Sequence, residues 1–211
     1  MIGAGGLLGK AVVRELQSRG GAVLTSTIPW SDPETALKAF REGAESLREA
    51  AASGPWTIAW CAGAGVTGTS PEALEAELSL FAGALEVFEE VLCDHDGDNG
   101  AMFLASSAGG VYAGSSTPPF TEHSPVQPLA PYGFAKLRAE ATVADFARRT
   151  GVRTLVGRVS NLYGPGQNLR KPQGLISVFA KAHLPGAPVS VYVSLDTLRD
   201  YLFVDDASRL V

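Results

Sequence analysis

The 211-residue sequence predicts an α/β fold built on a parallel sheet. Apolar runs of strand length alternate with longer stretches whose apolar residues recur at helical spacing. Such alternation indicates right-handed crossovers between parallel strands. A glycine-rich segment, GAGGLLG, spans Gly3 to Gly9 and opens the first helical stretch. Together these observations favour a Rossmann-like, doubly wound sheet.

Start and stop signals mark the predicted helices. Gly20 and Gly21 end the first helix. Asp32 or Ser31 can cap the second, and Ser70 precedes a proline at the first position of the third. The helices predicted after the first cover residues 33–51, 71–92, 132–149 and 174–183.

Four strands are predicted, at residues 22–25, 56–62, 101–106 and 152–159. A buried strand of about five or six residues should also precede the glycine segment. Only Met1 and Ile2 stand there. Either the chain is truncated at its start or the first strand is nearly absent, and we expect truncation.

Composition narrows the classes of partner. The net charge of −5 argues against a nucleic-acid partner, and no apolar run approaches the roughly 18 residues of a membrane span. The N-terminus has no secretory pattern, and Cys61 and Cys93 fit small core residues in a reduced cytosol. The three histidines lack metal-ligand spacing. We expect a cytoplasmic protein without a metal site.

A tyrosine and a lysine carry the strongest chemical signal. Tyr132 and Lys136 stand four residues apart, which places them on one helix face, where the lysine charge favours the phenolate. Such a phenol can exchange a proton with a substrate oxygen near neutral pH. Ser106 and Ser107 lie one strand and one loop upstream, and a serine hydroxyl can hold the same oxygen. This group suits interconversion of an alcohol and a carbonyl, which requires a hydride carrier.

The glycine segment is a candidate site for that carrier. A glycine turn opening a helix lets the backbone approach a pyrophosphate, and the helix N-terminus supplies N–H groups. Ligands of such sheets bind beyond the carboxyl ends of the strands. Glycine- and serine-rich loops at residues 3–9, 62–65, 106–110 and 160–166 follow expected strand ends. We therefore expect these loops to converge on one site.

Five motifs occur in an order that resembles a known family. They are GAGGLLG, SSAGGVY (106–112), YGFAK (132–136), RVSNLYGPGQN (158–168) and RDYLFVDD (199–206). The chain resembles the extended short-chain dehydrogenases, the NAD-dependent epimerase/dehydratase group that acts largely on nucleotide sugars. The resemblance covers nearly the whole chain.

The resemblance implies that the glycine segment cradles the pyrophosphate of a nicotinamide cofactor. Members specific for NAD carry an acidic residue after the second strand, whereas residues 25–27 are neither acidic nor basic, which leaves NAD and NADP open. The implied cofactor-binding residues are Gly3, Gly6, Leu7, Leu8, Gly9, Ala62, Gly63, Ser106, Tyr132 and Lys136.

By the same resemblance, Tyr132 is the catalytic acid/base, and Lys136 tunes it and holds the nicotinamide ribose. Ser107, with Ser106 as the second choice, binds the reacting oxygen of the substrate. Counting back along the commonest family pattern lands on Ala108 instead, so the choice of serine is open.

The implied substrate is a nucleotide sugar. Asn161 would contact it, and Arg199 would bind a substrate phosphate, which suits guanidinium geometry. The alternative for Arg199 is a surface salt bridge with Asp200 or Asp205. Relatives continue beyond the motif that ends at Asp206 into a small substrate-binding lobe. We therefore expect a cofactor-binding domain at residues 1–170, an incomplete substrate-binding portion at 171–211, and truncation at both ends.

Two classes of function remain. The first is an NAD(P)-dependent oxidoreductase or epimerase acting on a nucleotide sugar; Ala108 and Gly109 stand where dehydratases usually carry an Asp-Glu pair, which favours epimerase or reductase. The second is a non-catalytic NAD(P)-binding sensor or an incomplete fragment. The helix at 132–149 is apolar on more than one face, which predicts a homodimer.

Overall fold

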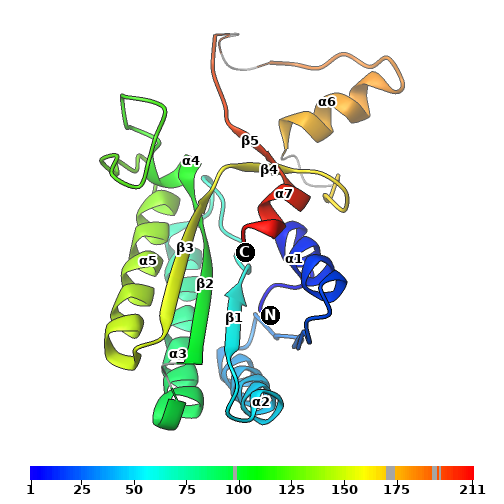
Figure 1. The fold of residues 1–211 in the computed structure, drawn as a ribbon. Coiled ribbons are helices and arrows are strands. Elements are labelled where there is room, and N and C mark those ends of the chain that lie inside the picture. The colour runs from blue at the N-terminus through cyan, green and yellow to red at the C-terminus, as the bar shows by residue number, and fades with distance from the viewer. Residues whose placement is uncertain (97–98, 170–173, 192–193, 195) are drawn as a thin grey trace.

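A three-stranded parallel sheet lies at the centre of the computed structural model (Figure 1), which describes all residues except 97–98, 170–173, 192–193 and 195. Its strands are β1 (Trp56–Trp60), β2 (Gly100–Ser107) and β3 (Arg153–Val159), in the order β1-β2-β3. The register pairs Trp56 with Gly100 and Ala101 with Arg153. All three carboxyl ends therefore point to one edge of the sheet.

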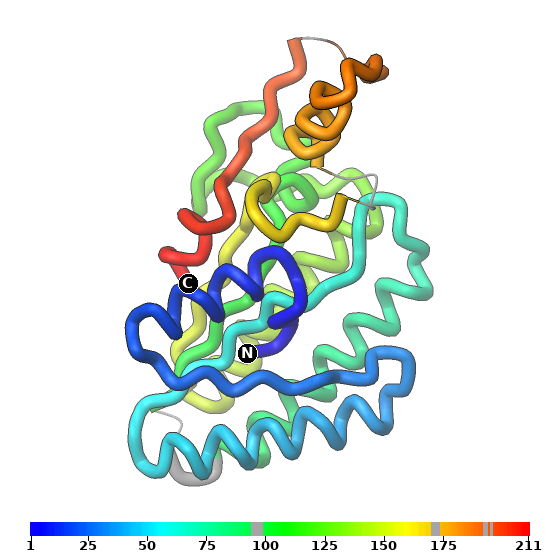
Figure 2. Tube along the Cα trace, turned by 90° about the vertical axis from the view of Figure 1, so that its right-hand side faces the viewer, coloured from blue at the N-terminus to red at the C-terminus, as the bar shows by residue number. Residues whose placement is uncertain are grey.

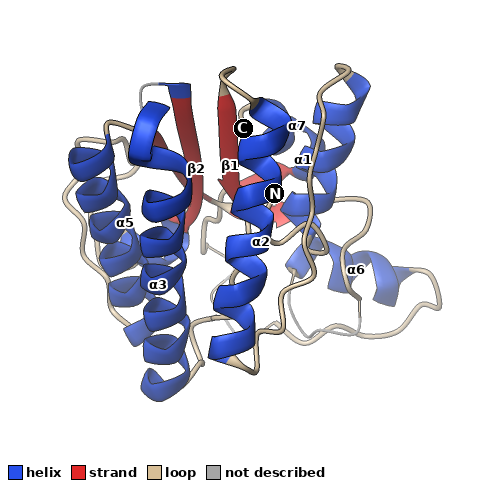
Figure 3. Cartoon of the chain, turned by 90° about the horizontal axis from the view of Figure 1, so that it is seen from below, coloured by secondary structure: helices blue, strands red, loops and turns tan. Residues whose placement is uncertain are grey.

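Successive side chains of a strand point to opposite faces of the sheet, and two apolar cores form, one on each face. Ile58, Trp60, Met102 and Leu104 face one core, whereas their neighbours, including Phe103, face the other. The first core is covered by α2 (Pro33–Ala51), α3 (Pro71–Asp96) and α5 (Pro131–Thr150), which lie side by side in Figure 3. The second core is covered by α1 (Leu7–Ser18) and α7 (Val204–Arg209). This arrangement confirms the predicted doubly wound α/β fold.

The predicted helices form where their capping residues stand. Asp32 accepts a hydrogen bond from the Thr35 backbone N–H at 3.3 Å and caps α2, whose bounds agree with the prediction. Ser70 accepts from the Ala73 backbone N–H at 3.3 Å at the start of α3. Gly151 ends α5 with φ +76°, a conformation that glycine adopts without strain.

The strand predicted at 22–25 does not form. Its partner would be the strand before the glycine segment, and that strand is reduced to Ile2, which makes a single parallel bridge with Trp60. The N-terminal ammonium donates to the Leu24 carbonyl at 2.9 Å, so this segment runs beside the start of the chain without a ladder. A strand without a partner ladder leaves its backbone to water, and residues 21–29 are irregular for that reason.

A second, two-stranded parallel sheet pairs distant parts of the chain. Strands β4 (Asn161–Tyr163) and β5 (Tyr201–Phe203) form it, and α7 follows β5 directly. Helix α7 packs against α1, so the last residues lie beside the first helix (Figure 2). Helix α4 (Ala108–Val111) is one turn after β2, and α6 (Leu175–His183) buries none of its residues. The division at residue 170 stays a prediction.

Candidate active site at the carboxyl edge of the sheet

The glycine segment is held against the chain that follows β1. Gly3 has φ +83°, and a Cβ atom there would lie 2.5 Å from the Ala62 nitrogen. Gly6 N–H donates to the Gly3 carbonyl at 3.0 Å and closes the turn. A Cβ at Gly9 would stand 2.1 Å from the Gly3 oxygen. Close backbone approach therefore requires glycine at positions 3 and 9.

Helix α1 begins without a capping side chain. Its N-cap residue is Gly6, and its first turn carries no acidic residue. The first amides of an α-helix have no acceptor within the helix and form the positive end of its dipole. A Cβ at Gly5 would meet no atom within 4 Å, so the outer side of the loop is open. These features fit a bound pyrophosphate, and Leu7, Leu8 and Gly9 would present their backbone N–H groups to it.

Tyr132 lies between two glycine-containing loops. A Cβ at Gly65 would stand 3.4 Å from its ring, and a Cβ at Gly110 would stand 3.0 Å from the other side. The Lys136 Nζ atom lies 5.6 Å from the centre of the Tyr132 ring. The same ammonium is 3.4 Å from the Cβ position of Gly63. The Tyr–Lys pair thus faces the loop after β1.

That loop also contacts the glycine segment, because Gly3 packs on Ala62. The loop at residues 62–65 therefore touches the candidate cofactor cradle with its first residue and the Tyr–Lys pair with the next ones. The structure brings the two groups together as the sequence predicts.

The two serines occupy different environments. Ser107 is half-buried and caps α4, where its Oγ accepts from the Gly110 N–H at 3.2 Å. Ser107 thus belongs to the loop that touches the Tyr132 ring. Ser106 is buried and donates its hydroxyl to Glu140 at 2.5 Å. Ser107 as the residue that binds the substrate oxygen and Ser106 as a cofactor contact both stay predictions.

Asn161 is the first residue of β4, and Arg199 lies in the segment just before β5. Within the described residues, their side chains donate to the backbone oxygens of Asp200 and Leu198, both at 2.9 Å, and not to the Tyr132 group. Arg199 is exposed. The Asp205 carboxylate, one of the alternative partners proposed for Arg199, accepts from Arg14 of α1 at 2.8 Å. The predicted contacts of Asn161 and Arg199 with a substrate stay predictions.

Glu77 of α3 belongs to the site and was not identified from the sequence. Its Oε2 atom accepts the backbone N–H groups of Ala64 and Gly65, both at 3.2 Å. Its Oε1 atom lies 3.3 Å from the Cβ position of Gly63, beside Lys136. Glu77 therefore fixes the loop that joins the cofactor cradle to Tyr132. Helical spacing places residue 77 on a helix surface and gives no indication of this partner.

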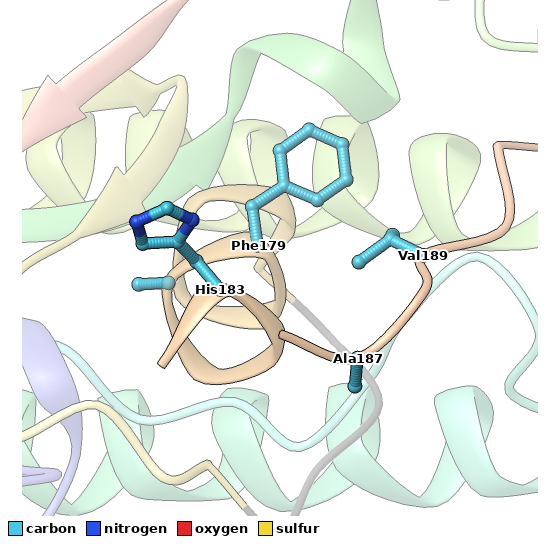
Figure 4. A pocket seen from close by; sticks show the side chains of 5 residues that line it. Phe179, His183, Ala187 and Val189 are labelled. Carbon is cyan, nitrogen blue, oxygen red and sulfur yellow. The ribbon is translucent and has the colours of Figure 1, made fainter. Parts of the chain in front are cut away.

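Two hollows are lined by neither residue of the Tyr132–Lys136 pair. One of about 490 Å³ is lined by side chains of α6 and the segment after it, with Phe179, His183, Ala187 and Val189 around it (Figure 4). The other, of about 260 Å³, lies between β3 and α7. In the described part of the chain, no group of three or more His, Cys, Asp or Glu residues could hold a metal ion, and no helix could cross a membrane.

Comparisons with known proteins agree with this arrangement. The model of a family described as the NAD dependent epimerase/dehydratase family matches residues 1–211. A dTDP-4-dehydro-6-deoxyglucose reductase of Escherichia coli is 32% identical over 105 residues, which are 50% of this chain and 33% of that protein. A dTDP-glucose 4,6-dehydratase of Neisseria meningitidis is 37% identical over 90 residues, 43% of this chain and 24% of that protein.

Among solved structures, the UDP-glucose 4-epimerase of Thermotoga maritima with UDP-glucose superposes with a TM-score of 0.76 at 24% identity. The match covers 99% of this chain and 70% of that one. The chain spans no more than about a third of the length of the two curated relatives.

Proposed function

The chain belongs to the NAD dependent epimerase/dehydratase family, and we propose that it transfers a hydride between NAD and a carbon of a nucleotide sugar, with Tyr132 as the acid/base. The membership confirms the resemblance seen in the sequence motifs. The observation that carries the proposal is the junction at residues 62–65, which contacts the glycine cradle on one side and the Tyr132–Lys136 pair on the other.

The residues of the chain have separate roles in this proposal. The turn at Gly3 to Gly9 and the start of α1 hold the pyrophosphate of NAD, which supplies the hydride acceptor when it is bound. Tyr132 takes the proton from the substrate hydroxyl as that group becomes a carbonyl and returns it in the reverse step. Lys136 stabilises the negative charge on the tyrosine oxygen, and Ser107 donates a hydrogen bond to the reacting oxygen.

A nucleotide sugar is the substrate class we propose, since two relatives are named for dTDP-sugars and a structural neighbour holds UDP-glucose. Arg199 is exposed, and a guanidinium that gives one hydrogen bond to the Leu198 carbonyl has further N–H groups for a phosphate of the nucleotide. Ala108 and Gly109, which follow Ser107, supply no carboxyl group for a dehydration step. Epimerisation or simple reduction therefore fits better than dehydration.

The test begins with the purified chain, NAD⁺ and NADP⁺ in a thermal-shift titration. A ligand at 100 times its dissociation constant stabilises the fold by about 2.7 kcal/mol, and we expect that shift with NAD⁺. Turnover is then measured with UDP- and dTDP-sugars. Tyr132→Phe should lower turnover by about 10²-fold or more, since it removes the proton carrier, while the NAD⁺ shift is unchanged. Retained turnover in this variant refutes the role of Tyr132, and an NAD⁺ shift without any turnover indicates a sensor.

A further inference from the structure

One ion pair in the described part of the chain is more buried than the others, and it lies one helical turn beyond Lys136. Glu140 of α5 and Arg158 of β3 form it, with side-chain exposures of 12% and 25%. Arg158 donates from Nη2 at 2.7 Å and from Nε at 3.1 and 3.2 Å to the two oxygens of Glu140. Such two-point contact fixes the direction as well as the distance between the side chains.

Further hydrogen bonds extend the pair to two other elements. Ser106 of β2 donates to Glu140, as described above. Arg158 Nη1 donates to the Tyr112 hydroxyl at 2.6 Å, and that hydroxyl donates to the Thr121 carbonyl at 2.9 Å. The Arg158 guanidinium also lies 5.1 Å from the centre of the Tyr112 ring. The ion pair therefore joins α5, β2, β3 and the segment after α4.

Each attachment point is a close neighbour of a site residue. Ser106 precedes Ser107, and Tyr112 stands two residues after Gly110, which touches the Tyr132 ring. Glu140 lies four and eight residues after Lys136 and Tyr132, so the three share one face of α5. The pair thus sets the depth and rotation of α5 against the strand that carries Ser107.

We propose that Glu140 and Arg158 are positioning residues, which hold Tyr132 and Ser107 at the spacing that proton transfer at the substrate oxygen requires. This inference rests on the proposed function. Glu140 and Arg158 lie outside the Tyr–Lys–Ser group, and neither side chain is assigned a contact with substrate or cofactor. A misplacement of about 1 Å can cost roughly 10²-fold in rate, so a loosened pair should lower kcat while cofactor binding persists.

The variant that tests the pair is Glu140→Gln, which keeps the shape and removes the charge that faces Arg158. The matched control is Glu89→Gln, which breaks the exposed ion pair that Glu89 of α3 makes with Arg149, farther along the same α5. Both variants are assayed as the full chain, well below their midpoints of thermal unfolding, for kcat, KM and the NAD⁺ thermal shift. Hydrogen exchange is followed at the amides of Gly110 and Tyr112, which bond to Ser107 Oγ and the Ala108 carbonyl.

For Glu140→Gln we expect kcat to fall at least tenfold, KM for NAD⁺ to stay within twofold, and exchange at Gly110 and Tyr112 to rise at least tenfold, with α2 unaffected. Glu89→Gln should match the wild type in all of these. The proposal is overturned if Glu140→Gln keeps kcat within twofold, or if its exchange rises equally in α2, which indicates a general loss of stability.

If Glu140→Gln does not fold, Arg158→Lys serves in its place, because lysine keeps the charge but lacks the forked contact with Glu140 and Tyr112. For Arg158→Lys too, the proposal is overturned if kcat stays within twofold or if exchange rises equally in α2. If the wild-type chain binds NAD⁺ but turns over no nucleotide sugar, the proposed function fails. The exchange measurement still shows whether the pair holds the Ser107–Tyr132 geometry.

Discussion

Replacement of Gly9 by alanine is the sharpest test of the cofactor cradle. The added Cβ would stand 2.1 Å from the Gly3 oxygen and 2.8 Å from the Gly3 carbonyl carbon, against about 3.4 Å for ordinary contact. Both atoms are backbone, so the loop itself has to retreat from α1. The movement would displace the amides that we assign to the pyrophosphate.

The expected magnitude combines two opposing effects. Alanine is favoured over glycine inside a helix by about 1 kcal/mol, whereas overpacking of this kind costs about 1–3 kcal/mol or more. Because the overlap is with backbone atoms, we take the upper half of the overpacking range. The net loss is then about 1–2 kcal/mol, which lowers the thermal midpoint by about 2–8 °C for a chain of this size. We also expect NAD⁺ to bind at least tenfold more weakly.

The assay is a thermal-shift titration with NAD⁺, and the matched control is Gly68→Ala, outside the glycine segment. A Cβ at Gly68 meets no atom within 4 Å, so that variant should bind NAD⁺ like the wild type. If Gly9→Ala binds NAD⁺ as tightly as Gly68→Ala does, the glycine segment is not the cofactor cradle.

Three further predictions follow from other parts of the structure. Glu77→Gln should weaken NAD⁺ binding severalfold by calorimetry, because the oxygen that accepts both backbone N–H groups of the loop after β1 loses its negative charge; unchanged affinity would contradict the role given to Glu77. Burial raises the pKa of the Cys61 thiol to about 12, so above pH 9 the unfolded chain releases a proton that the folded chain keeps, and stability falls as pH rises toward 12. Denaturant unfolding at pH 8 and pH 10 should show a smaller fall for Cys61→Ala than for the wild type, and equal falls would refute this assignment. Phe134 of α5 is 55% exposed, which is consistent with the predicted homodimer; light scattering should give twice the 22.0 kDa chain mass, and a monomeric mass would count against it.

Local signals in the sequence were sufficient for most elements. Helix α2 was predicted at its observed bounds because a capping aspartate, a proline at the first position and regular apolar spacing all act within one segment. The strand at 22–25 failed because a strand depends on its partner, and only Ile2 stands in the position of that partner. Its composition is no different from that of a strand that forms.

In the candidate site, too, local spacing identified some residues and gave no sign of partners that are distant in the sequence. Gly3, Gly9, Tyr132 and Lys136 were identified because their spacing along the chain carries the geometry. The hydroxyl of Ser106 donates to Glu140, which lies 34 residues away, and this partner could not be identified from the sequence. Partners chosen by packing at such separations leave no local pattern in the sequence.

The contact between α1 and α7 has a consequence for the order of folding. The Arg14–Asp205 pair spans 191 residues, and Leu8 and Val12 of α1 share an apolar cluster with Ala207. Contacts between such distant residues form slowly, because a long loop has to close first. Helix α1 is synthesised long before α7, so the part of its apolar face that Ala207 covers stays exposed until residues 201–211 have been made. The nascent chain should therefore reach full NAD⁺ affinity only after α7 has been made and has packed against α1.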